Sequence, residues 1–149
     1  MNDSTLRKAQ PGYRWAGVDL LGYKADGSAP FKDVTRQLLF RTDELGCELR
    51  YFEVAADGHS TLERHEHAHA VMILRGRGAC LVGGEVRSVG VHDLVHIPPM
   101  SWHQFRADAT EPLGFLCMVN VHRDRPQLPT EVDLAELRSN PVIGAFIRC

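Results

Sequence analysis

Residues 63–69 read Glu-Arg-His-Glu-His-Ala-His, and the apolar segment Val71-Met72-Ile73-Leu74 follows almost directly. The histidines at 65, 67 and 69 stand at alternate positions, and side chains at alternate positions of a strand point to one face. A further histidine, His103, comes much later in the chain, just past Pro98-Pro99. Because a neutral imidazole is a preferred ligand of zinc, nickel, copper and iron, this pattern predicts a metal site on a β-strand.

The size and charge of the chain suit one globular domain. It has 149 residues, of which 44% are hydrophobic and 24% charged, a balance typical of a folded domain with a sizeable core. The net charge of −2 gives no general attraction to nucleic acid or to an anionic membrane. The longest apolar run, near residues 113–119, is far too short to span a bilayer. We therefore expect one domain over residues 1–149, with no nucleic-acid or membrane partner.

Most of the chain reads as short strands separated by turns. Gly83-Gly84 between two short segments is a strong hairpin signal, and Ala56-Asp57-Gly58 predicts another turn. Many short strands at regular spacing, without helices between them, indicate an all-β antiparallel sandwich or barrel. The predicted strands are Tyr13–Val18, Val34–Arg41, Glu48–Ala55, Ser60–His65, His69–Arg75, Ala79–Val82, Glu85–Val89, Asp93–Ile97, His103–Ala107 and Phe115–His122.

The last part of the chain has a different pattern. Residues 131–138 carry apolar side chains at helical spacing, and Asn140-Pro141 reads as the cap and first turn of a second short helix that ends near Arg148. The predicted organisation is N-terminal strands in residues 1–46, a metal-binding barrel core in residues 47–122 and a tail with short helices in residues 123–149.

The cysteines Cys47, Cys80, Cys117 and Cys149 are widely spaced and form no CxxC pair. A thiolate zinc site is therefore not expected, and reduced thiols, most of them buried in strands, are the simplest interpretation. Nothing in the sequence marks Cys117 as a reactive nucleophile. The first five residues lack the apolar stretch of a signal peptide, so a cytoplasmic location is expected.

Two stretches of the chain together resemble the motifs of the cupin family of small metal-binding β-barrels. In the first, Gly58 precedes the histidine run, and an apolar strand then ends at Gly76. In the second, residues 93–105 carry the proline and the later histidine of the motif, with His103 as the ligand, although His92 stands where glycine is usual. The resemblance covers roughly residues 47–120. It implies a double-stranded β-helix (a jelly-roll barrel), one divalent metal ion and often a homodimer.

The resemblance also implies a ligand set. Family members usually carry the third ligand seven residues before the glycine that ends the strand, and counting back from Gly76 gives His69. The usual HxH pair then falls at Glu63 and His65. The implied set of Glu63, His65, His69 and His103 keeps the common composition of three histidines and one glutamate, in permuted order.

The fourth ligand stays open between Glu63 and His67. On a straight strand the Cα atoms of His65 and His67 lie roughly 6.6 Å apart, close enough to share an ion. Those of His65 and His69 would lie roughly 13 Å apart, so both can bind one ion only if the chain bends between them. If Glu63 is the ligand, the three residues between His65 and His69 are available to make this bend. If His67 is the ligand, only Ala68 lies between it and His69. The spacing therefore favours Glu63. The ion is expected to be zinc, nickel, manganese, iron or copper.

An ion with open coordination positions predicts a small metalloenzyme. Its substrate would be a small oxygenated or carboxylated molecule, attacked through Lewis-acid or dioxygen chemistry. The sequence does not choose among isomerase, decarboxylase and dioxygenase, and no catalytic residue can be assigned; Gln104, Tyr51 and Glu66 are unsupported acid or base candidates. The alternatives are a non-catalytic module that binds or senses a small ligand, and a structural oligomeric barrel. Apolar side chains on the N-terminal strands, such as Trp15 and Leu38, predict a homodimer.

Overall fold

The computed structural model describes residues 6–23 and 32–149. The first five residues, from which no signal peptide is expected, lie outside these ranges. Within them the strands are β1 (Ala9–Gln10), β2 (Arg14–Trp15), β3 (Leu21–Gly22), β4 (Lys32–Thr42), β5 (Cys47–His59), β6 (His69–Arg75), β7 (Arg77–Val82), β8 (Glu85–Gly90), β9 (Leu94–Ile97), β10 (His103–Ala107) and β11 (Leu113–Asn120), and the helices are α1 (Glu131–Ser139) and α2 (Pro141–Phe146).

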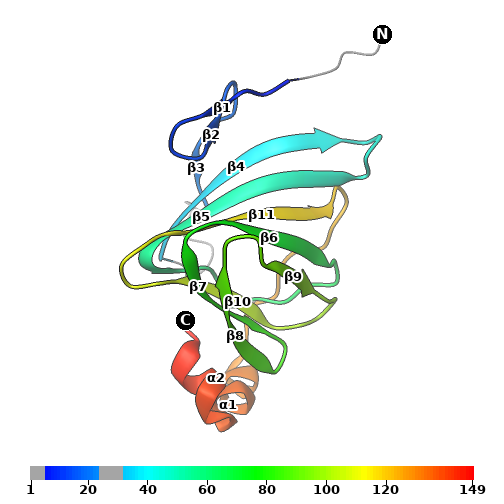
Figure 1. The fold of residues 1–149 in the computed structure, drawn as a ribbon. Coiled ribbons are helices and arrows are strands. Elements are labelled where there is room, and N and C mark those ends of the chain that lie inside the picture. Colours follow the sequence, from blue (N-terminus) through cyan, green and yellow to red (C-terminus); the bar gives the residue numbers. More distant parts are fainter. Residues whose placement is uncertain (1–5, 24–31) are drawn as a thin grey trace.

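The strands curl into the predicted all-β jelly-roll barrel. One large antiparallel sheet has the order β8-β7-β10-β5-β11-β6-β9, and β4 pairs with β5 at its side. In Figure 1, β4, β5 and β11 run side by side along one wall, and β7, β8 and β10 form the opposite wall next to the helices. Strand β5 belongs to both walls, because it pairs with β11 along residues 47–54 and with β10 at His59.

The turn predicted at Ala56-Asp57-Gly58 is wrong. These residues lie inside β5, although Asp57 adopts a positive φ of 62°. The backbone there still forms a hydrogen bond to a distant segment: the N–H of Asp57 donates to the carbonyl of Asp108, just after β10, at 2.9 Å. Turn-forming residues therefore bend the strand from one wall to the other instead of reversing it.

The strand predicted at Ser60–His65 is also wrong. Only Glu63 and Arg64 make isolated bridges, to His103 and Gln127 respectively. Because these partners belong to the barrel end and to the tail, no continuous ladder forms here. The histidine segment is therefore a bent connection that enters β6 at His69.

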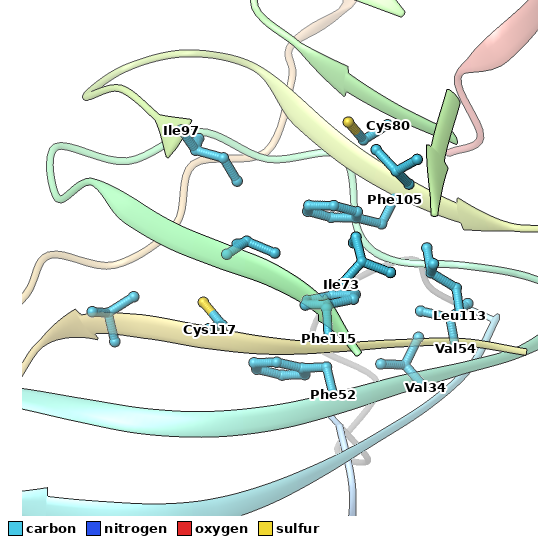
Figure 2. Close-up of a cluster of buried hydrophobic side chains, with 13 residues drawn as sticks. Val34, Phe52, Val54, Ile73, Cys80, Ile97, Phe105, Leu113, Phe115 and Cys117 are labelled. Carbon is cyan, nitrogen blue, oxygen red and sulfur yellow. The ribbon is translucent and has the colours of Figure 1, made fainter. Parts of the chain in front are cut away.

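The core fills the barrel interior below the histidines. Figure 2 shows Phe52, Phe105 and Phe115 directed toward one another from three strands. Their ring centroids lie 5.6 Å apart for Phe52–Phe115 and 4.5 Å apart for Phe105–Phe115. Ile73 and Leu113 are fully buried beside them. This packing fixes the distance between the two walls of the barrel. It therefore also fixes the positions of His69 and His103, which adjoin these rings.

The helices pack outside the wall that contains β7 and β8, at the end of the molecule away from β1 (Figure 1). Thr130 caps α1 through a capping box with Asp133. Asn140 caps α2, with Pro141 in its first turn, and this second cap is the one that the sequence predicts. Helix α2 ends at Phe146, slightly before the predicted Arg148. The helices bury a second apolar cluster against the barrel. Within the described ranges, no helix has the length and apolar character needed to cross a membrane.

Candidate metal centre

Three histidines converge at one end of the barrel. His69 and His103 are the first residues of β6 and β10, and His65 lies in the connection before β6. One nitrogen from each lies within 4.8 Å of the others, and the Nε2 atoms of His65 and His69 are only 2.7 Å apart. The bend that the sequence requires between His65 and His69 is therefore present. Asp124 holds it in place, because its carboxylate accepts the backbone N–H groups of Glu66 and His67 at 2.8 and 3.2 Å.

The second nitrogen of each histidine has a protein partner. The Nδ1 atoms of His65 and His103 donate to the carbonyls of His67 and Ser101, at 2.7 and 2.9 Å. The Nδ1 atom of His69 lies 2.8 Å from the Cys117 sulfur. A carbonyl oxygen only accepts, so the protons of His65 and His103 sit on Nδ1, and the lone pair of each Nε2 is the one that can coordinate a metal ion. Such partners on the other ring nitrogen are typical of metal-ligating histidines.

Burial keeps the imidazoles of His65 and His69 neutral. It lowers the pKa of His65 from 6.5 to about 4, with the neighbouring His103 and His67 acting in the same direction. Burial, followed by His103 and His65, also lowers the pKa of His69. A neutral imidazole is the form that binds a metal. The cluster is therefore suited to holding a metal cation at neutral pH.

The two candidates for the fourth ligand occupy different environments. Neither Glu63 nor His67 belongs to the group whose ligand atoms converge within 4.8 Å. Glu63 is buried, and its backbone pairs with that of His103 in both directions, at 3.2 and 3.0 Å. The ring of His67 stacks flat on His65 at 3.7 Å, and its Nδ1 lies 2.7 Å from an oxygen of Asp124.

Two cavities adjoin the cluster, and Glu63 lines both. The inner one lies among the core aromatic rings and also contacts Cys117. The outer cavity has a volume of about 360 Å³ and is lined by His65, His67 and His69. A cavity of that size accommodates a small organic substrate. An ion held by the three histidines would thus face a space open to substrate.

Cys117 is a site residue that the sequence analysis missed. It is buried on the inner face of β11, and its sulfur lies 2.8 Å from Nδ1 of His69 and 3.4 Å from Nη2 of Arg50. Burial raises the pKa of this thiol, while Arg50 acts in the opposite direction. The alternation of buried Phe115, Cys117 and Val119 along β11 was the available signal, since it places the thiol on the interior face.

The acid and base candidates named from the sequence lie elsewhere. Gln104 is fully buried and bonds to the backbone of Ser60 and Arg148, so it anchors the C-terminus. The hydroxyl of Tyr51 donates to Glu53 on the outer face of β5, and Glu66 is exposed. None of the three lines either cavity beside the cluster.

Comparison with known proteins assigns the family. The model of the cupin domain matches residues 50–119. A protein of Rhodospirillum rubrum named 1-methylthio-D-xylulose 5-phosphate methylsulfurylase is 62% identical over 146 residues, covering 98% of this chain and 94% of its own. The crystal structure of a cupin 2 conserved barrel domain protein from Rhodopseudomonas palustris is 59% identical, with a TM-score of 0.93 over 97% of this chain and 100% of its own. That of a cupin-2 domain protein from Rhodospirillum rubrum is 63% identical, with a TM-score of 0.86 over 95% of each chain. The chain therefore belongs to the cupin family.

Proposed function

We propose that this protein is a metal-dependent enzyme that removes the methylthio group from a 1-methylthio-ketose 5-phosphate. The observation that carries the proposal is the position of Cys117, whose sulfur lies 2.8 Å from a histidine of the cluster. Transfer of a methylthio group needs a sulfur acceptor, and a cysteine beside the candidate metal site can supply it. The relative from Rhodospirillum rubrum, 62% identical, carries this activity in its name.

We infer that His65, His69, His103 and Glu63 hold one divalent transition ion. Three imidazoles and one buried carboxylate suit zinc, nickel, manganese, iron or copper. When bound, such an ion acts as a Lewis acid toward the oxygen atoms of a ketose and so favours negative charge on them. Glu63 is preferred to His67 because it lines both cavities, whereas His67 is engaged by its stack on His65 and its contact with Asp124.

The thiolate of Cys117 attacks the sulfur of the methylthio group in this mechanism. A sulfur–sulfur bond forms between the cysteine and the methylthio group, and the bond from that sulfur to C1 of the ketose breaks. The electron pair of the broken bond remains on the sugar as an enolate, which takes a proton from water at C1 and becomes a 1-deoxy-ketose phosphate. The N–H groups of His69 and Arg50 that face the sulfur stabilise the thiolate against the effect of burial.

A low-molecular-weight thiol completes the cycle. Its thiolate attacks the methyl disulfide on Cys117, releases the methylthio group as a mixed disulfide and restores the cysteine thiolate. The sugar is thereby reduced at C1, and the external thiol is oxidised. A reducing compartment supplies such a thiol, and all four cysteines are free thiols in the structure. These features support a cytoplasmic enzyme, and we propose that residues 1–149 act as one domain within a homodimer.

The mechanism is tested by following the methylthio group. With 1-methylthio-D-xylulose 5-phosphate and no added thiol, intact-protein mass spectrometry should show one methylthio adduct per chain. Cys117→Ser should abolish both the adduct and the dethiomethylated product. Cys80→Ser is the matched control, because Cys80 is also a buried thiol but lies on β7, outside the two cavities beside the cluster. An adduct that persists in Cys117→Ser, or full turnover by that variant, would contradict the proposal.

The fourth ligand is tested separately by metal analysis. Glu63→Gln should lower the bound metal more than His67→Ala, because the proposed set includes the carboxylate and not the His67 imidazole. The greater loss in His67→Ala would assign the ligand to His67 instead. Elemental analysis of protein purified without a histidine tag supplies the measurement.

A further inference from the structure

Two arginines lie diagonally across the barrel wall, at the same end as the histidines. Strand β4 pairs with β5 so that Arg36 faces Phe52, and Arg50 stands two residues before Phe52 on β5. Diagonal neighbours in an antiparallel pair are roughly 7–8 Å apart, so two long side chains there can reach one ligand. Both arginines line the outer cavity together with His65 and His69.

Arg50 is a buried cation that has no carboxylate partner among the residues the structure describes. It is 6% exposed; its guanidinium lies 3.4 Å from the Cys117 sulfur and 4.9 Å from the centre of the Phe52 ring. Among residues 6–23 and 32–149, no carboxylate lies within ion-pair distance of Arg50 or Arg36. The buried Nε atoms of both guanidinium groups have no hydrogen-bond partner in the same part of the chain.

Two other arginines of the barrel are paired with glutamates. Arg123, which lines the same cavity, contacts Glu48 at 2.9 Å, and Arg75 contacts Glu53 at 2.9 Å. Burying a guanidinium without a counter-charge is unfavourable, because the charge loses its hydration and gains no partner. Arg50 and Arg36 are therefore arranged for an anion that enters from outside.

We propose that Arg36 and Arg50 bind the phosphate group of the substrate. This inference rests on the proposed function, which supplies a sugar phosphate as ligand. A guanidinium presents a planar fork of N–H donors that matches two phosphate oxygens, and two such forks on adjacent strands can hold a dianion. Arg50 donates to Cys117 through one Nη, which leaves its Nε and other Nη for the phosphate. The phosphate end of the sugar is thus held beside the wall of β4 and β5, and the methylthio end lies at Cys117.

The test uses calorimetric binding of two probes to the metal-loaded protein. D-xylulose 5-phosphate carries the phosphate but no methylthio group, and D-xylulose carries neither. The wild type should bind the phosphorylated probe at least tenfold more tightly than the unphosphorylated one. Arg36→Met and Arg50→Met should each weaken binding of the phosphorylated probe by about tenfold or more, a loss typical of a charged hydrogen bond, and leave the weak binding of D-xylulose unchanged.

Matched controls separate this site from general effects on the fold. Arg75→Met removes an arginine on the outer face of the barrel and should bind both probes as the wild type does. Arg50→Lys keeps the positive charge but lacks the planar set of N–H donors, so its affinity for the phosphorylated probe should be intermediate. If Arg50→Met does not fold, Arg50→Lys replaces it in the test. Wild-type affinity for the phosphorylated probe in Arg36→Met and in the folded Arg50 variant would overturn the proposal. So would equal affinity of the wild type for the two probes.

The outcome is distinguishable from failure of the proposed function. Neither probe has a methylthio group, so their binding does not depend on attack by Cys117. If the wild type binds the phosphorylated probe through Arg36 and Arg50 but does not turn over 1-methylthio-D-xylulose 5-phosphate, the anion site stands and the proposed reaction is wrong. If turnover occurs but the arginine variants bind the phosphorylated probe normally, the reaction stands and this site is wrong.

Discussion

Acid should destabilise the metal-free protein through His65, and the direction follows from its burial. The pKa of this imidazole is lowered to about 4 in the folded protein, against 6.5 for an ordinary histidine. Below pH 6.5 the unfolded chain therefore binds a proton that folded His65 does not. Since stability falls wherever the unfolded state binds more protons, the free energy of unfolding should decrease as the pH drops from 6.5 to about 4.

The size of this effect can be worked out from the same shift. A difference of one in pKa corresponds to about 1.4 kcal/mol, so His65 alone contributes a loss of about 3 kcal/mol by pH 4. The lowered pKa of His69 adds a loss in the same direction. Such a loss is a large part of the roughly 5–15 kcal/mol that stabilises a typical domain.

The assay is urea unfolding of chelator-treated protein at pH 7 and at pH 4.5. His65→Asn removes the titrating group, so its free energy of unfolding should fall by about 2–3 kcal/mol less than that of the wild type over this interval. His92→Asn is the control, because His92 is exposed in a turn with a φ of 73° that asparagine tolerates, and it should behave as the wild type does. The same pH dependence in His65→Asn and the wild type would refute the reasoning.

Three further predictions concern the metal, the packing and the assembly. The purified wild type should carry about one divalent ion per chain, and elemental analysis should show that His103→Ala loses it while exposed His92→Ala retains it; equal metal content in the two variants would exclude His103 as a ligand. Gly114→Ala should lower the free energy of unfolding by about 1–3 kcal/mol, because its new methyl group would lie 2.0 Å from the Tyr51 hydroxyl, whereas Gly90→Ala, with open space around it, should cost less. Light scattering at micromolar concentration should give the mass of two chains, and deletion of residues 1–41 should give monomer or aggregate; a single-chain mass for the intact protein would contradict the homodimer.

Local patterns in the sequence were sufficient to predict most strands of the barrel. The predicted bounds of β6 (His69–Arg75) and β10 (His103–Ala107) match the structure, and the hairpin at Gly83-Gly84 joins β7 to β8. Alternation of side chains and turn residues are short-range signals, so a sequence carries them without knowledge of the fold. The errors at 56–58 and 60–65 occur where long-range backbone bonds replace the local ladder or turn.

The sequence by itself therefore determined the strand pattern, the family resemblance and the histidines of the candidate site. Only the tertiary structure decided that a bend held by Asp124 brings His65 to His69, and that Cys117 lies against His69. It also decided that Arg36 and Arg50 share a cavity with these histidines. The physical reason is that side chains meet here across strands that are distant in the chain. Register and the curl of the sheet, which are set by packing of the whole core, determine which of them face one another.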